Sequence, residues 1–124
     1  MQALLKHLPK FWMQDESILY IGKADRQSLQ KRVSQFYRHR VGKKSPHKGG
    51  YWLKLLSDIS SFYIHILPTD NSHEIEEQML QYFIENVTED SKSRLIDKDL
   101  CLPFANLQLR SGVIKKHGLK KHYQ

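Results

Sequence analysis

The chain has 124 residues, which is enough for one domain with a hydrophobic core and too few for two. Hydrophobic residues make up 40% of it, but no apolar run approaches the ~20 residues of a membrane-spanning helix. The N-terminus lacks the long apolar segment of a secretory signal, and the single cysteine, Cys101, has no partner for an internal disulfide. We therefore expect a cytoplasmic protein that does not contact a membrane.

Residue spacing argues against several common sites. The seven histidines and one cysteine have no Cys-x-x-Cys or His-x₃-His spacing, so a zinc site is not expected. The sequence also lacks the glycine-rich loop that binds nucleotide phosphates and the Gly-x-Ser-x-Gly elbow of many hydrolases. We expect no organic cofactor.

The charge is unevenly distributed along the chain, which has a formal net charge of +7. From Lys23 to Lys54 there are ten Lys or Arg residues and one acid, whereas Asp70 to Asp99 holds nine acids and three bases. The stretch from Cys101 to Gln124 has five Lys or Arg residues and no acid. A polyanion lying across part of the surface would account for this pattern. A soluble domain with an uneven surface charge is the alternative.

Three segments have the pattern of strands. Residues 11–13 and 18–22, joined by a turn at 14–17, are predicted to form a hairpin. In 61–67, Phe62, Ile64 and Ile66 alternate with other residues, and Pro68 ends the run.

Two longer segments are predicted to be helical. The first begins after Asp25 or Ser28, either of which can cap it, and runs to about His39 or Arg40. Its buried side is marked by Leu29, Val33 and Phe36.

The second helix is capped by Asn71 or Ser72 and extends to about Asn86. Its apolar residues at near-helical spacing are Ile75, Met79, Phe83 and Val87.

The remaining segments are less regular. Residues 42–50 are rich in Gly, Pro and Lys, and 88–100 are polar and expected to be looped or partly helical. Residues 102–107 return to apolar character, and 110–124 are expected to be a mobile basic tail. The order of elements predicts one α+β domain, residues 1–124, with a small three-stranded antiparallel sheet flanked by helices.

Tyr20-Ile21-Gly22 at the end of the second strand, followed by Leu29-x-x-Arg32 on the helix, resembles the second half of the GIY-YIG nuclease signature. An acidic helix and a Pro-x-x-Asn step ending at Asn106 extend the resemblance over roughly Phe11 to Asn106. The family architecture is also a small antiparallel sheet with helices. The resemblance implies an endonuclease that hydrolyses DNA phosphodiester bonds with one Mg²⁺ or Mn²⁺ ion.

Four residues take catalytic roles through this resemblance. Tyr20 would position or deprotonate the attacking water, and the planar guanidinium of Arg32 would stabilise the transition state. Glu76 would bind the metal, and Asn106 would complete the site. Glu77 is the alternative to Glu76, and Asn106 could instead cap a turn.

The chain also departs from the signature. The first tyrosine should stand about ten residues before Tyr20, where this chain has Lys10 beside Phe11 and Trp12. Within a Ser-Pro-His-Lys-Gly-Gly insert, His47 could act as a base or a phosphate contact, or could fix the loop backbone.

DNA is the expected partner, although RNA fits the same charge pattern. The residues expected to contact its phosphates are Lys23, Lys31, Arg38, Arg40, Lys43, Lys44 and Lys48. Because the first tyrosine is missing, a catalytically inactive nucleic-acid-binding module on the same fold is the second hypothesis. A protein-interaction domain that uses the basic segment to bind an acidic partner is the third.

Overall fold

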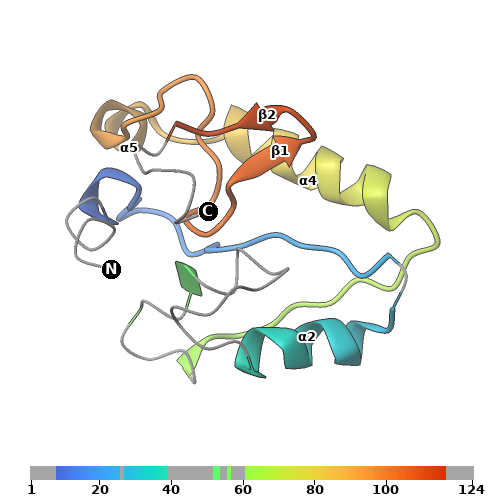
Figure 1. Cartoon of the computed structure of the whole chain (residues 1–124). Helices are drawn as coiled ribbons and strands as arrows, with labels where there is room; N and C mark the ends of the chain where they lie inside the picture. The colour runs from blue at the N-terminus through green and yellow to red at the C-terminus, as the bar shows by residue number, and fades with distance from the viewer. Residues whose placement is uncertain (1–7, 26, 39–51, 54–55, 57–60, 117–124) are drawn as a thin grey trace.

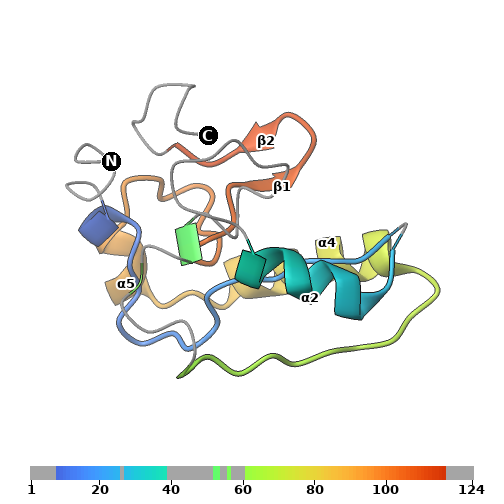
Figure 2. The same ribbon diagram turned by 60° about the horizontal axis from the view of Figure 1, so that its bottom comes forward.

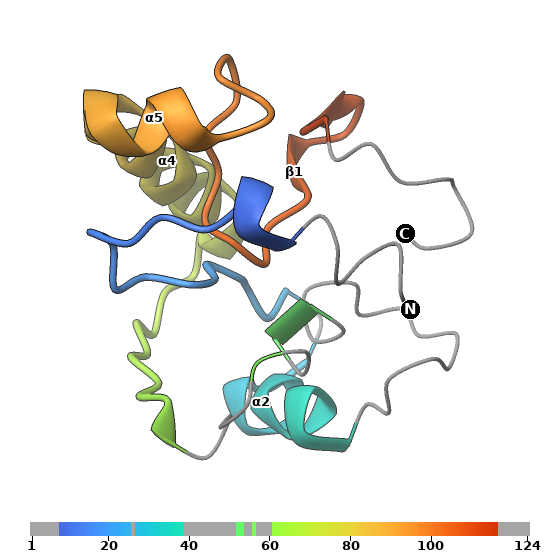
Figure 3. The same ribbon diagram turned by 90° about the vertical axis from the view of Figure 1, so that its left-hand side faces the viewer.

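The computed structural model describes residues 8–25, 27–38, 52–53, 56 and 61–116. In chain order these contain η1 (Leu8–Lys10), α2 (Leu29–Arg38), α4 (Ser72–Glu85), α5 (Glu89–Arg94), β1 (Gln108–Arg110) and β2 (Val113–Ile114). The protein is therefore a mixed helix-and-sheet, α+β molecule. The extended segment 11–24 runs between α2 on one side and α4 on the other (Figures 1 and 3).

The sheet in the described part of the chain lies near the C-terminus. β1 and β2 form an antiparallel pair in which Gln108 faces Ile114 and Arg110 faces Val113. The turn between them contains Gly112 at φ +80°, a left-handed conformation that glycine adopts without a steric cost. Residues 110–116 thus belong to a folded hairpin and its exit, where the sequence predicted the start of a mobile tail. Residues 117–124 of that tail lie outside the described residues.

The three segments expected to be strands are not assigned as strands. Residues 11–13 and 18–22 are largely extended, and 18–22 is hydrogen-bonded to a turn rather than to a neighbouring strand. Residues 62–69 are extended, but Tyr63 is 91% exposed and Ile64 and Ile66 are exposed too. An alternating pattern indicates an extended conformation, but it does not say whether another backbone lies alongside.

Helix α2 begins where its capping residue predicts. The Ser28 hydroxyl accepts a hydrogen bond from the backbone N–H of Lys31 at 3.1 Å, and the Ser28 carbonyl accepts from the N–H of Arg32 at 3.1 Å. Ser28 therefore satisfies an N–H group that has no partner inside the helix. The predicted C-terminal residues His39 and Arg40 lie outside the described residues.

Helix α4 is flanked by Asn71 and Asn86, as the sequence predicts. Leu80 is 1% exposed, whereas its neighbour Met79 is 45% exposed. The inward stripe follows the spacing of three, four and seven through Leu80, Phe83, Ile84 and Val87. Of the apolar residues at near-helical spacing in the sequence, Phe83 and Val87 therefore face the core and Met79 does not. None of the described helices combines the length and apolar character needed to cross a lipid bilayer.

A short polar network attaches α5 to the N-terminal segment. The Thr88 hydroxyl caps α5 by accepting from the N–H of Ser91 at 3.2 Å. The Asp15 carboxylate accepts hydrogen bonds from the hydroxyls of Thr88, at 2.6 Å, and Ser91. These hydroxyl bonds lower the pKa of Asp15 below its ordinary value.

Residues 101–107 form the most continuously buried run of the described chain and join two hydrophobic clusters. The first cluster is formed by Met13, Ile21, Leu80, Phe83, Leu95, Cys101, Leu102 and Leu109. The second is formed by Phe11, Trp52, Leu53, Phe104, Ala105 and Leu107. Because both clusters draw on segment 11–21 as well as on 101–107, these two segments form the centre of the molecule.

Substitution on α4 tests which face of the helix is buried. Leu80→Ala should lower the free energy of unfolding by about 2–5 kcal/mol, since it removes a side chain that is almost fully enclosed. Met79→Ala on the neighbouring exposed face should change it by less than about 1 kcal/mol. Urea denaturation of the two variants measures both values. Equal losses, or a larger loss at Met79, would contradict this orientation of α4.

Candidate functional site

The segment that carries Tyr20 is held by the turn at residues 103–106. The N–H of Ala105 donates to the carbonyl of Leu19 at 2.9 Å. The Asn106 side chain accepts from the N–H of Ile21 at 2.9 Å and donates to the carbonyl of Ile21 at 2.8 Å. The backbone is therefore fixed on both sides of Tyr20.

The Asn106 side chain holds the backbone of Ile21 through two hydrogen bonds. This side chain is buried, and its amide oxygen and nitrogen are both engaged with the backbone of Ile21. An amide is the side-chain group that pairs in this way with a backbone N–H and C=O together, because it offers one acceptor and two donors. Asn106 thus lies next to Tyr20 in space, and it acts on the segment that carries it.

Gly22 leaves room for the Tyr20 ring. A Cβ atom placed on Gly22 would lie 2.8 Å from the Tyr20 hydroxyl oxygen and would also meet carbon atoms of the ring. The ring folds back over the glycine, so any side chain at this position would displace it. This close approach explains the glycine two residues after the tyrosine.

Tyr20, Arg32 and Glu76 come together from three separate segments. Burial raises the pKa of the Tyr20 phenol above its ordinary value of about 10. The positive charge of Arg32 and a hydrogen bond from its guanidinium act in the opposite direction, while the negative charge of Glu76 raises the pKa further. Arg32 Nη1 also donates to Gln35 Oε1 at 3.3 Å, which holds the guanidinium along α2.

Glu76 and Glu77, the two candidates for the metal ligand, have different surroundings in the structure. Glu76 is half-buried, and burial raises the pKa of its carboxyl, while the nearby charges of Lys23, His73 and Arg32 lower it. Glu77 points elsewhere and forms an ion pair with Arg110 of β1 at 2.8 Å. Glu76 is therefore the glutamate that faces Tyr20 and Arg32.

Asp25, Ser72 and His73 stand beside this group together with Lys23, and the sequence did not mark these first three as site residues. The Ser72 hydroxyl donates to Asp25 Oδ1 at 2.7 Å, and Lys23 Nζ lies 3.5 Å from Asp25 Oδ2. Lys23 Nζ is also within hydrogen-bonding distance of His73 Nδ1. Ser72 and His73 precede Glu76 by four and three residues on one helix, and this spacing was the available signal.

The two aromatic residues near the expected first tyrosine pack against other rings, although Phe11 is buried and Trp12 is 36% exposed. The Phe11 ring packs edge-on against Trp52 with their centroids 5.0 Å apart, and Trp12 packs against Phe104 at 5.3 Å. Phe11 is buried by this contact. Its position therefore carries a packing role, and no phenol stands there.

The remaining residues predicted to take part in the site or to contact nucleic acid lie either on α2 or outside the described residues. Lys31 is exposed on α2, and Arg38 is the last residue of that helix. The others, His47, Arg40, Lys43, Lys44 and Lys48, lie outside the described residues.

Within the described ranges, no cluster of three or more His, Cys, Asp or Glu side chains could hold a metal ion by itself. Comparison of the chain with protein-family models, curated proteins and solved structures gave no match. What the site can do is therefore argued from its own geometry.

The charges around Tyr20 can be tested by titrating its phenol. Replacing Arg32 with Gln should raise the pKa of Tyr20, because it removes a positive charge and a hydrogen bond that favour the phenolate. Replacing Glu76 with Gln should lower it, because it removes a negative charge. Ultraviolet difference titration, with Tyr20→Phe identifying the signal, measures both shifts. Shifts of the same sign, or none, would contradict the convergence of the three residues.

The Asn106 contact has its own test. Asn106→Ala should leave the N–H and C=O of Ile21 without their buried partners and destabilise the fold by about 2–4 kcal/mol. Hydrogen exchange at the Ile21 amide should accelerate more than exchange in the middle of α4. If the exchange of Ile21 is unchanged, the amide contact is not what holds this segment.

Proposed function

We propose that the protein is a divalent-metal-dependent endonuclease of the GIY-YIG type that hydrolyses DNA phosphodiester bonds. One observation carries the proposal: Tyr20, Arg32 and Glu76, chosen from the sequence for their family roles, interact electrostatically although they come from three segments. A hydroxyl, a guanidinium and a carboxylate in one group are what such a hydrolysis requires.

The residues present fit a single Mg²⁺ or Mn²⁺ ion. Glu76 is a hard oxygen ligand, and it has no ion pair among the described residues. Burial raises the pKa of its carboxyl, so a bound cation would offset the cost of its charge. One carboxylate together with water and substrate oxygens is a common way of binding Mg²⁺. When bound, the ion would supply Lewis-acid stabilisation of charge on the phosphate.

The other roles in the proposed hydrolysis would be taken by side chains of the protein. Arg32 would bind two phosphate oxygens through its planar guanidinium and stabilise the charge that develops on them. The phenol of Tyr20 is neutral at neutral pH even at its ordinary pKa of about 10, and burial raises that pKa, so its hydroxyl would orient the attacking water through a hydrogen bond. Asn106 would keep Tyr20 in place through Ile21. Lys23 and the exposed Lys31 would contact flanking phosphates.

The proposal extends to the fold. We assign segments 11–13, 18–22 and 61–67 to the three-stranded sheet of the GIY-YIG architecture within a single domain of residues 1–124. Segment 62–69 follows the α2 side of the molecule and leads into α4, so in chain order it lies between the two helices, where the third strand is expected (Figures 1 and 2). The alternation of apolar residues in 61–67 supports the same assignment.

One observation favours a second function, a nucleic-acid-binding module without activity. Lys10 stands at the expected position of the first tyrosine and the neighbouring Phe11 packs in the core, so one family hydroxyl is missing. Such a module would bind DNA or RNA through its basic residues with a strong dependence on salt, and it would not cleave.

Paired glutamate variants distinguish the two functions. With Mg²⁺ or Mn²⁺, the native protein should cut plasmid, single-stranded or branched DNA, and Glu76→Gln should reduce the rate by at least roughly 10²-fold while leaving binding intact. Glu77→Gln is the matched control, since Glu77 pairs with Arg110, and it should retain most of the rate. Gel-based cleavage and fluorescence anisotropy measure the two quantities. Salt-dependent binding by a native protein that cuts none of these substrates would identify the inactive module instead.

A further inference from the structure

Lys115, the residue after β2, is buried although its side chain can carry a charge. It is 5% exposed, and its backbone N–H donates to the carbonyl of Leu107 at 3.0 Å. Its Nζ donates to the carbonyl oxygens of Phe104, at 2.9 Å, and Pro103, at 3.4 Å. The side chain therefore ends on the backbone of the turn at residues 103–106.

Aromatic rings surround the same amine. Nζ lies 5.0 Å from the centroid of the Trp52 ring and 5.5 Å from that of Phe11. Trp52 also packs edge-on against Phe104 at 5.6 Å. A cation against ring faces is attracted by their negative potential, so these contacts partly offset the cost of burying the ammonium.

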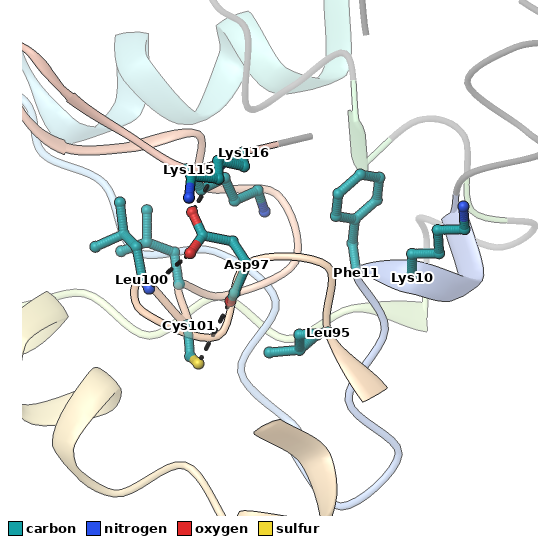
Figure 4. Close-up of a pocket in the computed structure, with 9 residues that line it drawn as sticks. Lys10, Phe11, Leu95, Asp97, Leu100, Cys101, Lys115 and Lys116 are labelled. Atoms are coloured by element: carbon teal, nitrogen blue, oxygen red, sulfur yellow. Dashed lines mark hydrogen bonds between the residues drawn. The ribbon is translucent and has the colours of Figure 1, made fainter. Parts of the chain in front are cut away.

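Among the described residues, few ionisable groups lie near the Lys115 amine. Asp97 lies on the loop after α5, and its Oδ2 accepts from the backbone N–H of Lys116 at 2.7 Å. Lys10 of η1, Cys101 and Lys116 are the other titratable residues that line the same small pocket (Figure 4). Burial lowers the pKa of Lys115 to about 7, against a smaller opposite effect of Asp97. Both the amine and the ammonium carry N–H donors, so contact with the two carbonyls is possible in either form.

The turn that receives Lys115 is also the one that holds the Tyr20 segment. The carbonyl of Pro103 accepts from the N–H of Asn106 at 3.0 Å as well as from Lys115. Ala105 and Asn106 of this turn bond Leu19 and Ile21, on either side of Tyr20. A continuous series of hydrogen bonds through the turn at residues 103–106 therefore connects the Lys115 amine to the segment that carries Tyr20.

We propose that Lys115 is a positioning residue for Tyr20, acting through the turn at residues 103–106. The amine fixes the carbonyls of this turn, and the turn fixes the backbone on both sides of Tyr20. Its effect on cleavage rests on the proposed function, whereas its effect on the Tyr20 segment does not.

The test compares Lys115→Met with Lys116→Met. The first variant keeps most of the apolar stem but removes the N–H donors, and the second removes the same charge from the adjacent exposed residue. In K115M, amide exchange at Ile21 and Ala105 should accelerate about 10-fold relative to amides in the middle of α4. The pKa of the Tyr20 phenol should fall toward its ordinary value, because the ring becomes less enclosed. K116M should match the native protein in both respects.

A purely structural role predicts a different result. If Lys115 only fills the core, K115M will accelerate exchange uniformly and leave the pKa of Tyr20 unchanged, and that outcome overturns the proposal. If K115M does not fold, Lys115→Leu takes its place, since leucine also lacks the N–H donors to the Pro103 and Phe104 carbonyls. The same local acceleration is then required, and native exchange at Ile21 and Ala105 overturns the proposal.

Cleavage kinetics add a separate readout. In K115M, kcat should fall about 10-fold with little change in KM, because Tyr20 is displaced while the phosphate contacts remain. Absence of cleavage by the native protein would reject the proposed nuclease, but the exchange and titration results would still decide whether Lys115 positions Tyr20.

Discussion

The fold depends on how the turn at residues 103–106 is bound to the segment around Tyr20. Two of the three hydrogen bonds come from the Asn106 side chain, which pairs with Ile21 as a neighbouring strand would. The third joins Ala105 to Leu19. Both segments are lined by buried apolar residues, so their polar backbone groups need partners inside the protein. The contact satisfies those groups, and it also brings the two hydrophobic clusters together.

The same contact explains why the candidate site is well defined although the described sheet is small. Tyr20 is fixed by backbone bonds on either side and by its packing over Gly22. Arg32 comes from the first turn of α2, and Glu76 from near the start of α4. Two of the groups lie on helices and the third on a segment held by hydrogen bonds, which limits their movement, as the proposed stabilisation of charge on a phosphate would require. Lys115 binds a carbonyl of the turn at residues 103–106, and its amine lies against the rings of Phe11 and Trp52.

The sequence predicted the features that local chemistry determines. Ser28, one of two candidate caps, caps α2 through its hydroxyl, because capping depends on residues close in the chain. Asn71, also one of two candidates, stands at the start of α4 without a capping hydrogen bond from its side chain. The resemblance to a nuclease signature pointed to Tyr20, Arg32 and Glu76, and the structure brings their charges close enough to act on one another. Their catalytic roles stay a prediction. The choice between Glu76 and Glu77 needed the fold, since it depends on Arg110 from a distant strand.

Other features depend on packing between residues far apart in the chain, so they could not be predicted from the local sequence. Met79 and Leu80 are both apolar, and only the position of the core decides which one faces it. The hairpin at 108–114 lies in a basic stretch whose composition is typical of a tail, and Lys115 is buried against the expectation for its type. The role of Asn106 required knowing that Ile21, 85 residues earlier, lies beside it.

The central claim is that Glu76 and the Tyr20 segment form one metal-dependent site, and Mn²⁺ titration followed by NMR tests it most directly. A paramagnetic ion broadens the signals of nearby nuclei, so Mn²⁺ at Glu76 should broaden Ile21 and Tyr20 together with the first turns of α2 and α4. This broadening should be lost in E76Q and kept in E77Q. Broadening that is absent, that survives in E76Q, or that is confined to acidic residues of α5 would contradict the account.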